Sequence, residues 1–300
     1  MSVKHYFTPT TIAECLELLN TFEGRASLIA GGTDLMLWLE KGKRRPEILI
    51  DTTLIPEIGN VTVSGDEVSI GAAVTHAIAA VHPWLSEKVP VLADACMSVG
   101  SPQIRNVGTL AGNVVAAQPA ADSAIALVAL GATAEIVSAG ARRVEPVKDL
   151  YAGIGKSKVD HTREMITCFR FRVSSQNMGT AFERIAPRKA SALPVVNVGV
   201  VLQSERGVIT KAGIAMGPVA RHPFTPEGAE RMLVGTKAGD EAAWRAAGVQ
   251  AAREANPRDS LLRGSAEYRR VLVQDLVARA IRVAAGRAFG SKSSGRPAQY

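Results

Sequence analysis

The chain carries near its start the stretch Ser27-Leu28-Ile29-Ala30-Gly31-Gly32-Thr33-Asp34-Leu35. Its first four residues predict a short buried strand, and helical character resumes over residues 35–40 until Gly42. Two consecutive glycines can adopt positive φ and let a ligand approach the backbone without a Cβ in the way. The amides that follow then point toward an anion, with the Thr33 hydroxyl as a further donor. The order strand, glycine loop, helix therefore indicates a phosphate site. An ordinary turn with Thr33 or Asp34 as helix N-cap explains the same residues.

This loop differs from two well-known nucleotide motifs. No Gly-Lys-Ser/Thr follows it, so it is not a Walker loop, and its glycines do not have the GxGxxG spacing of a Rossmann dinucleotide site.

The elements around the loop predict mixed α and β structure. Thr11 and Glu14 form a capping-box pattern before a helix whose apolar face includes Cys15 and Leu19. Residues 46–51 predict a second strand, and residues 61–63 and 68–70 a hairpin. Two short helices are expected near residues 77–81 and 89–97.

A second glycine-rich segment runs from Val99 to Asp122. Within it, Gly108 and Gly112 are expected to bracket a short turn in which Thr109 and Asn113 supply polar groups. Asp122 precedes an apolar helix over residues 123–130 and could simply be its N-cap. Arg105 could equally be a surface or structural arginine.

The second half of the chain predicts strands followed by helices. Strands are expected at 134–137 and 165–170, and a polar connection at 174–177 suggests a domain boundary. Residues 180–185, 195–202 and 208–216 predict a three-stranded meander, closed by two or three helices that include a long one over 265–288. Strands followed by helices indicate an α+β unit. The tail, residues 289–300, is expected to be disordered.

Composition excludes several classes of protein. A chain that is 47% hydrophobic and 21% charged is typical of a globular protein, and 300 residues allow one large or two to three smaller domains. The net charge of +7 comes from dispersed basic residues, apart from short groups at 41–45 and 184–189, so we expect no nucleic acid as partner.

The three cysteines are far apart and form no CxxC, so we expect them to be buried and to hold no metal or cluster. The start lacks the apolar core of a secretory signal, and the apolar stretch around residues 124–134 is too short to span a bilayer. We therefore expect a cytoplasmic protein with no membrane span.

Taken together, the two glycine segments resemble a known family. Ala30–Asp34 is similar to the first loop, and Arg105–Asn113 to the second, of the FAD-binding domain in the molybdopterin dehydrogenases, the xanthine dehydrogenase-like family; Ala117–Asp122 matches the motif that follows. The resemblance implies an α+β fold: a two-lobed FAD-binding domain of PCMH/vanillyl-alcohol-oxidase type over 1–174, with subdomains of about 1–55 and 56–174. A small α+β domain similar to that of the CO dehydrogenase flavoprotein, a three-stranded sheet with helices, would follow over 178–288.

The same resemblance implies a set of FAD-binding residues: Ile29, Ala30, Gly31, Gly32, Thr33, Asp34, Leu35, Gly108, Thr109, Gly112, Asn113, Asp122, Ile166 and Arg184. The first loop would wrap the diphosphate and the second would lie on its other side. Asp122 would bond the ribose or a neighbouring part of the flavin chain. Ile166 would lie near the isoalloxazine, and Arg184 stands where relatives often have lysine. Ala111 departs from the frequent Gly-Gly pair, which makes the geometry of the second loop less defined.

The resemblance also implies partners. A large subunit would hold the molybdopterin cofactor and a small subunit two [2Fe–2S] clusters, and the complex would be a dimer of heterotrimers. Electrons would leave through FAD to an external acceptor such as NAD+ or a quinone. The scattered histidines form no nucleophile–base arrangement, which agrees with a chain whose cofactor performs the redox step. Three alternatives stay open: an assembly subunit with an unused flavin site, a stand-alone FAD oxidoreductase, and a nucleotide-binding module.

Overall fold

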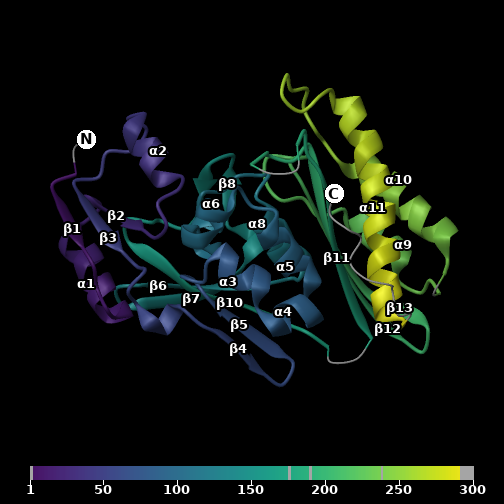
Figure 1. The fold of residues 1–300 in the computed structure, drawn as a ribbon, viewed down its shortest axis with the longest axis horizontal. Helices are drawn as coiled ribbons and strands as arrows, with labels where there is room; N and C mark the ends of the chain where they lie inside the picture. Colours follow the sequence, from purple (N-terminus) through teal and green to yellow (C-terminus); the bar gives the residue numbers. More distant parts are fainter. Residues whose placement is uncertain (1–2, 175–176, 189–190, 238, 291–300) are drawn as a thin grey trace.

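The computed structural model describes residues 3–174, 177–188, 191–237 and 239–290. The chain begins with a small parallel sheet of order β1-β3-β2, made of β1 (His5–Phe7), β3 (Ile48–Asp51) and β2 (Ala26–Ile29). Helix α1 (Ile12–Thr21) connects β1 to β2, and the short α2 (Leu35–Glu40) follows β2 at the upper left of Figure 1. The predicted strands and helices of this segment are confirmed; β1 was not predicted.

The start of α1 shows how local sequence sets the fold. The amide of Glu14 donates to the Thr11 hydroxyl at 3.1 Å, as the capping pattern predicts. The Glu14 carboxylate accepts from the amide of Thr10 at 2.8 Å, one residue before the position that a strict capping box uses. Cys15 and Leu19 are buried in the core below.

The second sheet is antiparallel, with the order β4-β5-β10-β6-β7. Its strands are β4 (Val61–Ser64), β5 (Glu67–Gly71), β10 (Glu164–Arg172), β6 (Thr133–Ser138) and β7 (Ala141–Pro146). The predicted hairpin and the strands β6 and β10 are confirmed. The sequence did not predict β7, because this edge strand reads Ala-Arg-Arg-Val-Glu-Pro and carries charges where an apolar alternation would mark a strand. The two-stranded pair β8 (Tyr151–Gly153) and β9 (Lys156–Ser157) was not predicted either.

Six helices lie between β5 and β6: α3 (His76–Val81), α4 (Pro83–Lys88), α5 (Pro90–Met97), α6 (Pro102–Val107), α7 (Leu110–Val115) and α8 (Asp122–Ala129). The sequence predicted α3, α5 and α8 and overlooked the other three. Prolines begin α4, α5 and α6, where the fixed φ suits the first helical residue. The expected turn at Gly108–Gly112 was wrong: Thr109 caps α7, and Gly112 lies inside that helix.

The third sheet is the predicted meander, β11 (Met178–Ile185), β12 (Val196–Glu205) and β13 (Val208–Gly217). Helices α9 (Glu227–Leu233), α10 (Glu241–Glu254) and α11 (Ala266–Ala288) cover one of its faces at the right of Figure 1. The other face packs on α5 and α8, which joins the third sheet to the rest of the molecule. The long predicted helix is confirmed, with Ser265 as its N-cap.

The core forms two main clusters. One draws most of its members from the first 173 residues, and the other draws its members from β11 onward. All three cysteines are buried, as predicted. Ser175 and Gln176 of the predicted boundary, and residues 291–300 of the predicted tail, lie outside the described residues. Among the described residues, no helix has the length and apolar character needed to cross a membrane, and no cluster of His, Cys, Asp or Glu could hold a metal ion.

Candidate functional site

A cavity of about 680 Å3 lies where the first parallel sheet, helices α6 and α7 and the strand β10 meet. Its volume is in the range of small-molecule and cofactor sites. Twelve of the fourteen predicted site residues line it: Ile29, Ala30, Gly31, Gly32, Thr33, Asp34, Leu35, Gly108, Thr109, Gly112, Asn113 and Ile166. Two segments that are about 75 residues apart in the sequence thus share one wall.

The first loop offers unused backbone donors. Among the described residues, the amides of Gly31, Gly32, Thr33 and Asp34 make no hydrogen bond to another protein group. Asp34 occupies the N-cap position of α2, yet its side chain forms no capping bond. An ordinary capped turn would need the Thr33 or Asp34 side chain to accept from these amides, and neither does, so the capped turn does not explain the loop. Burial raises the pKa of the Asp34 carboxyl.

The two glycines of this loop have different reasons to be glycine. Gly32 has a φ of +68°, the left-handed region that side chains rarely adopt. Gly31 has no room for a side chain, because a Cβ there would lie 1.9 Å from the carbonyl oxygen of Val107. Val107 ends α6, so Gly31 is the residue at which the first loop meets the second glycine segment.

The second segment is mostly satisfied by the protein itself. The amides of Leu110 and Ala111 donate to the carbonyls of Val74 and Ala72 beside β5, at 3.1 and 3.4 Å. The amide of Gly112 donates to the Thr109 hydroxyl. The Asn113 side-chain oxygen accepts from the Ser123 hydroxyl at 2.8 Å, and Asn113 lines the cavity, so its amide nitrogen remains available as a donor. This segment can therefore contribute side-chain donors and little of its backbone.

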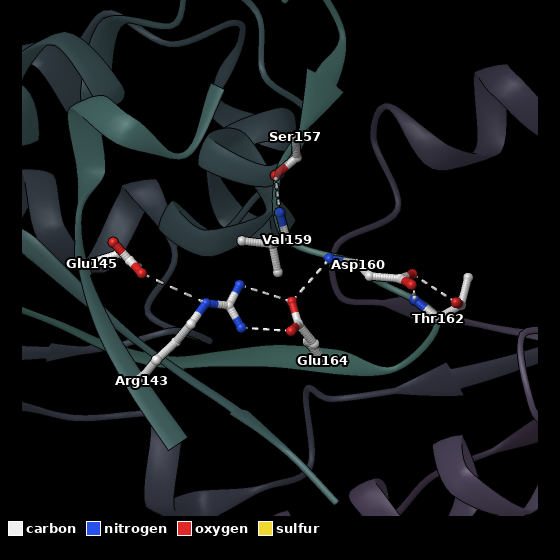
Figure 2. Close-up of polar contacts among 7 residues, drawn as sticks. All are labelled: Arg143, Glu145, Ser157, Val159, Asp160, Thr162 and Glu164. Carbon is white, nitrogen blue, oxygen red and sulfur yellow. Dashed lines mark hydrogen bonds and ion pairs between the residues drawn. The ribbon is translucent and has the colours of Figure 1, made fainter. Parts of the chain in front are cut away.

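The far wall of the cavity comes from β10 and the loop before it. Glu164 lines the cavity, and Figure 2 shows its carboxylate held by both terminal nitrogens of Arg143, at 2.5 and 2.9 Å. The same carboxylate accepts from the amide of Asp160 at 3.1 Å, and Asp160 in turn binds the Thr162 hydroxyl at 2.6 Å. These contacts fix the segment that carries Val159 into the lining. Arg143 belongs to the strand that the sequence did not predict, so this support was not foreseen.

Two histidines, His76 and His161, line the cavity. His76 is 2% exposed, and burial, with the nearby Arg105 charge, lowers its pKa from 6.5 to about 4. Its Nδ1 has no partner within the described residues. His161 Nδ1 lies 3.2 Å from the Ser27 hydroxyl, and burial followed by the Arg44 charge lowers its pKa. Neither histidine was predicted to have a role, because a lone histidine carries no local signal in the sequence.

Basic residues lie at two places on the lining. Lys43 and Arg44 follow α2, and the Arg44 guanidinium stacks on the Trp38 ring, 4.6 Å from its centroid. Arg258 and Arg263 come from the loop between α10 and α11. The basic run at 41–45 was visible in the sequence. The second pair could not be assigned, because its position depends on packing of the third sheet.

Asp122 and Arg184 do not line the cavity. Arg184 lies 3.6 Å from the Asp122 carboxylate, with side-chain exposures of 13% and 6%, and Asn197 donates to Asp122 at 2.6 Å. Burial raises the pKa of Asp122, although Arg184 and Asn197 act against it. These residues connect α8 to β11 and β12 behind the cavity wall. Asp122 is not the N-cap of α8 either, since Ala121 occupies that position.

Comparisons with known proteins agree on one family. The family described as the FAD binding domain in molybdopterin dehydrogenase matches residues 1–171, and the CO dehydrogenase flavoprotein C-terminal domain matches residues 181–284. The chain is 32% identical to the nicotine 6-hydroxylase medium subunit of Paenarthrobacter nicotinovorans, over 92% of this chain and 95% of that one. It is 31% identical to the nicotinate dehydrogenase FAD-subunit of Eubacterium barkeri, over 77% and 79%.

A solved structure of similar fold is a chain of carbon monoxide dehydrogenase from Hydrogenophaga pseudoflava. It superposes with a TM-score of 0.88 at 27% identity and covers 95% of this chain and 98% of that chain. The match therefore extends over both main core clusters and over the cavity between the loops.

Proposed function

Because this chain belongs to the family of FAD-binding domains of molybdopterin dehydrogenases, we propose that it carries electrons through FAD within a heteromeric molybdenum hydroxylase. The chain is a flavoprotein subunit of an oxidoreductase. In the proposed complex, a large partner subunit holds the molybdopterin cofactor and a small one two [2Fe–2S] clusters. Electrons pass from those clusters to the FAD of this chain and then to an external acceptor.

One observation carries the assignment of the cofactor to the cavity. Gly31 to Asp34 present four unbonded amides at the point where the first loop touches the end of α6. Backbone amides of this kind suit a diphosphate, because they donate to its oxygens without a side chain between. The Thr33 hydroxyl, the Thr109 hydroxyl and the side-chain amide of Asn113 are further donors on the lining.

The other residues of the cavity suit the apolar ring system of a flavin. Met165 and Ile166 are buried on β10 and line the cavity together with Ile154 and Val159. Such a wall excludes water from one side of the ring. When bound, FAD supplies one- and two-electron redox chemistry, and the chain supplies its position and surroundings. The neutral His76 and the neutralised Glu164 add little charge to that wall.

Asp122 and Arg184 have an indirect part in this proposal. Their ion pair fixes α8 and β11 beside the cavity, so they would position the wall rather than contact the cofactor. The remaining predicted residues stay as proposed FAD contacts.

We also propose two domains, 1–174 and 178–288, the first with subdomains of about 1–55 and 56–174. The separate core cluster of the third sheet and its helices supports this division. Limited proteolysis should cut between them at residues 174–178, and a first cleavage inside either domain would contradict the boundary. A cytoplasmic location and a dimer of heterotrimers remain predictions.

The experiment that tests the function is purification of the tagged chain from its own cells, followed by mass spectrometry with flavin, iron and molybdenum analysis. We expect one FAD per chain, a large molybdenum-containing chain and a small iron–sulfur chain. A complex that contains iron and molybdenum but no flavin would favour an assembly subunit with an unused flavin site. A flavin-containing chain that turns over substrate alone would favour a stand-alone oxidoreductase.

A further inference from the structure

The turn that follows α2 has a fixed shape. Gly42 has a φ of +64°, and its amide donates to the carbonyl of Leu39 at 3.0 Å. The amide of Lys43 donates to the carbonyl of Trp38 at 2.8 Å. These two bonds and the left-handed glycine form a Schellman motif, which ends a helix and directs the chain away from it. The basic residues 41–45 are therefore held in one place at the end of α2.

Helix α2 carries apolar side chains on two sides. Leu35 and Leu39, four residues apart, are buried in a small cluster with the first parallel sheet. Met36 and Leu37 lie outside that cluster and are 41% and 49% exposed. Figure 1 shows α2 at the edge of the molecule. The outer side of α2 is therefore apolar and open to solvent.

Positive charge surrounds this apolar spot. Lys41, Lys43 and Arg45 are exposed, and none of them forms an ion pair with a residue that the structure describes. Glu40 is the only carboxylate between residues 35 and 45. We call Met36, Leu37, Lys41, Lys43 and Arg45 the α2 face. Such a face is complementary to a protein surface that has carboxylates around a small apolar area.

The α2 face lies next to the proposed flavin site. Trp38 and Arg44, on the same helix and turn, line the cavity, and so does Lys43 of the face itself. The other four members of the face are outside the lining. A helix with its side chains is about 10 Å across, so one helix would separate a protein docked on the face from the cavity. That separation gives electrons a short path between FAD and a docked protein.

The size and chemistry of the face fit a transient partner. A six-residue helix and its turn supply far fewer residues than the about 20–30 that each side of a stable interface contributes. Contacts between electron-transfer proteins are at the small end of interface sizes. Complementary charges in such contacts raise the rate of association. The face therefore fits a protein that docks, accepts an electron and leaves.

We propose that the α2 face docks the external electron acceptor, and that this acceptor is a small acidic protein that carries one electron at a time. The inference rests on the proposed function, because the electrons come from FAD in the cavity. Each reduced FAD gives one electron to each of two oxidised carrier molecules in succession, and its two protons pass to solvent. Met36 and Leu37 supply the apolar centre of the contact, and the three cations steer the carrier toward it.

The test uses the purified FAD-loaded complex and measures its reoxidation. The complex is photoreduced without oxygen and mixed in a stopped-flow instrument with an oxidised acidic plastocyanin, with an oxidised basic cytochrome c, or with soluble benzoquinone. The variant is Lys41→Glu with Arg45→Glu. The matched control is Lys211→Glu with Arg253→Glu, which changes the net charge equally at two exposed cations outside the cavity lining. FAD content and subunit composition are measured first.

We expect the wild-type rate constant with plastocyanin to fall as salt rises, because salt screens the attraction between opposite charges. In the Lys41→Glu, Arg45→Glu variant, the rate constant with plastocyanin at low salt should fall at least about tenfold, and that with cytochrome c should rise. The control should stay within about twofold of wild type with both proteins. Benzoquinone should oxidise all three complexes at equal rates, because it is neutral and needs no docking face.

Three results would overturn the inference. Equal plastocyanin rates in wild type and the Lys41→Glu, Arg45→Glu variant would mean that electrons leave elsewhere. A wild-type plastocyanin rate that does not fall with salt would contradict the charge complementarity. Loss of a partner subunit or of FAD from the variant would assign the face to assembly or to the cofactor. A wild-type complex without FAD would instead refute the proposed function, and this is seen before any carrier is added.

Discussion

Replacing Gly31 by alanine tests the contact between the two glycine segments. The new Cβ would lie 1.9 Å from the carbonyl oxygen of Val107 and 2.8 Å from the amide nitrogen of Gly108, whereas ordinary contact begins at 3.4 Å. The loops would have to separate by about 1.5 Å, the difference between 3.4 and 1.9 Å, along that direction. The second segment cannot yield easily, because its amides are bonded to the carbonyls of Val74 and Ala72. The first loop must therefore move.

A movement of that size exceeds the range over which an amide hydrogen bond survives. If two of the amides lose their phosphate bonds, at about 1.5–3 kcal/mol each, FAD should bind at least about a hundredfold more weakly. The clash between the new Cβ and Val107, and the displacement of the loop that removes it, should also lower the free energy of unfolding by about 1–3 kcal/mol. The assay is calorimetric titration of FAD into the apo complex, beside thermal unfolding without FAD.

Two control variants separate the possible causes. At Gly59 the nearest atom to a new Cβ is 3.5 Å away, so Gly59→Ala should leave FAD affinity unchanged. Gly32→Ala has the strain of a left-handed residue, about 1–2 kcal/mol, but meets only flexible side chains of Ile29 and Met36. It should weaken FAD binding less than Gly31→Ala. Wild-type FAD affinity in a folded Gly31→Ala protein would refute the assignment of this loop.

Three further variants test the surroundings of the cavity. Burial lowers the pKa of His76 from 6.5 to about 4, so the unfolded chain binds more protons than the folded chain between these pH values. The stability that neutral His76 provides is therefore complete above pH 6.5, and about 3 kcal/mol of the free energy of unfolding is lost as the pH falls to 4. Urea unfolding of His76→Gln should show less loss than wild type over that window, and an unchanged loss would contradict the burial argument. Arg184→Ala should cost about 3 kcal/mol by leaving Asp122 without its buried partner, while the folded protein keeps its FAD; the opposite pattern would make Arg184 a flavin contact. Glu164→Gln should cost about 1 kcal/mol at low salt and less at high salt, as expected for a partly exposed ion pair with Arg143. A salt-independent loss in chemical denaturation would mean that packing dominates.

Sequence patterns predicted the parts of this fold in which local preference and tertiary packing agree. Strand β12 is rich in valine and buried along most of its length, and α11 has both a serine cap and a long periodic face. The strand–glycine–helix order around Gly31 was also readable, because turn chemistry is local. The structure places both glycine segments on one cavity, as expected from the family resemblance.

The parts that could not be predicted depend on distant neighbours. Strand β7 is charged along its length and is held at the sheet edge by pairing with β6 and by the Arg143–Glu164 ion pair, which joins residues 21 positions apart. Asp122 resembled an N-cap because it precedes a helix, yet its partners Arg184 and Asn197 come from the third sheet. The role of Gly31 against Val107 was invisible because it requires the docking of two separate segments.

The position of β10 has a consequence for how the protein is made. This strand is the last of its sheet to be synthesised, and it pairs with β5 on one side and β6 on the other. A nascent chain that ends before Glu164 thus leaves the sheet in two separate hairpins and lacks one wall of the cavity. Because domains fold as units during translation, the ribosome must release residues through Arg172 before FAD can be captured. Cofactor insertion should therefore follow the synthesis of β10, and chains that are stalled or cleaved before that strand should emerge without flavin.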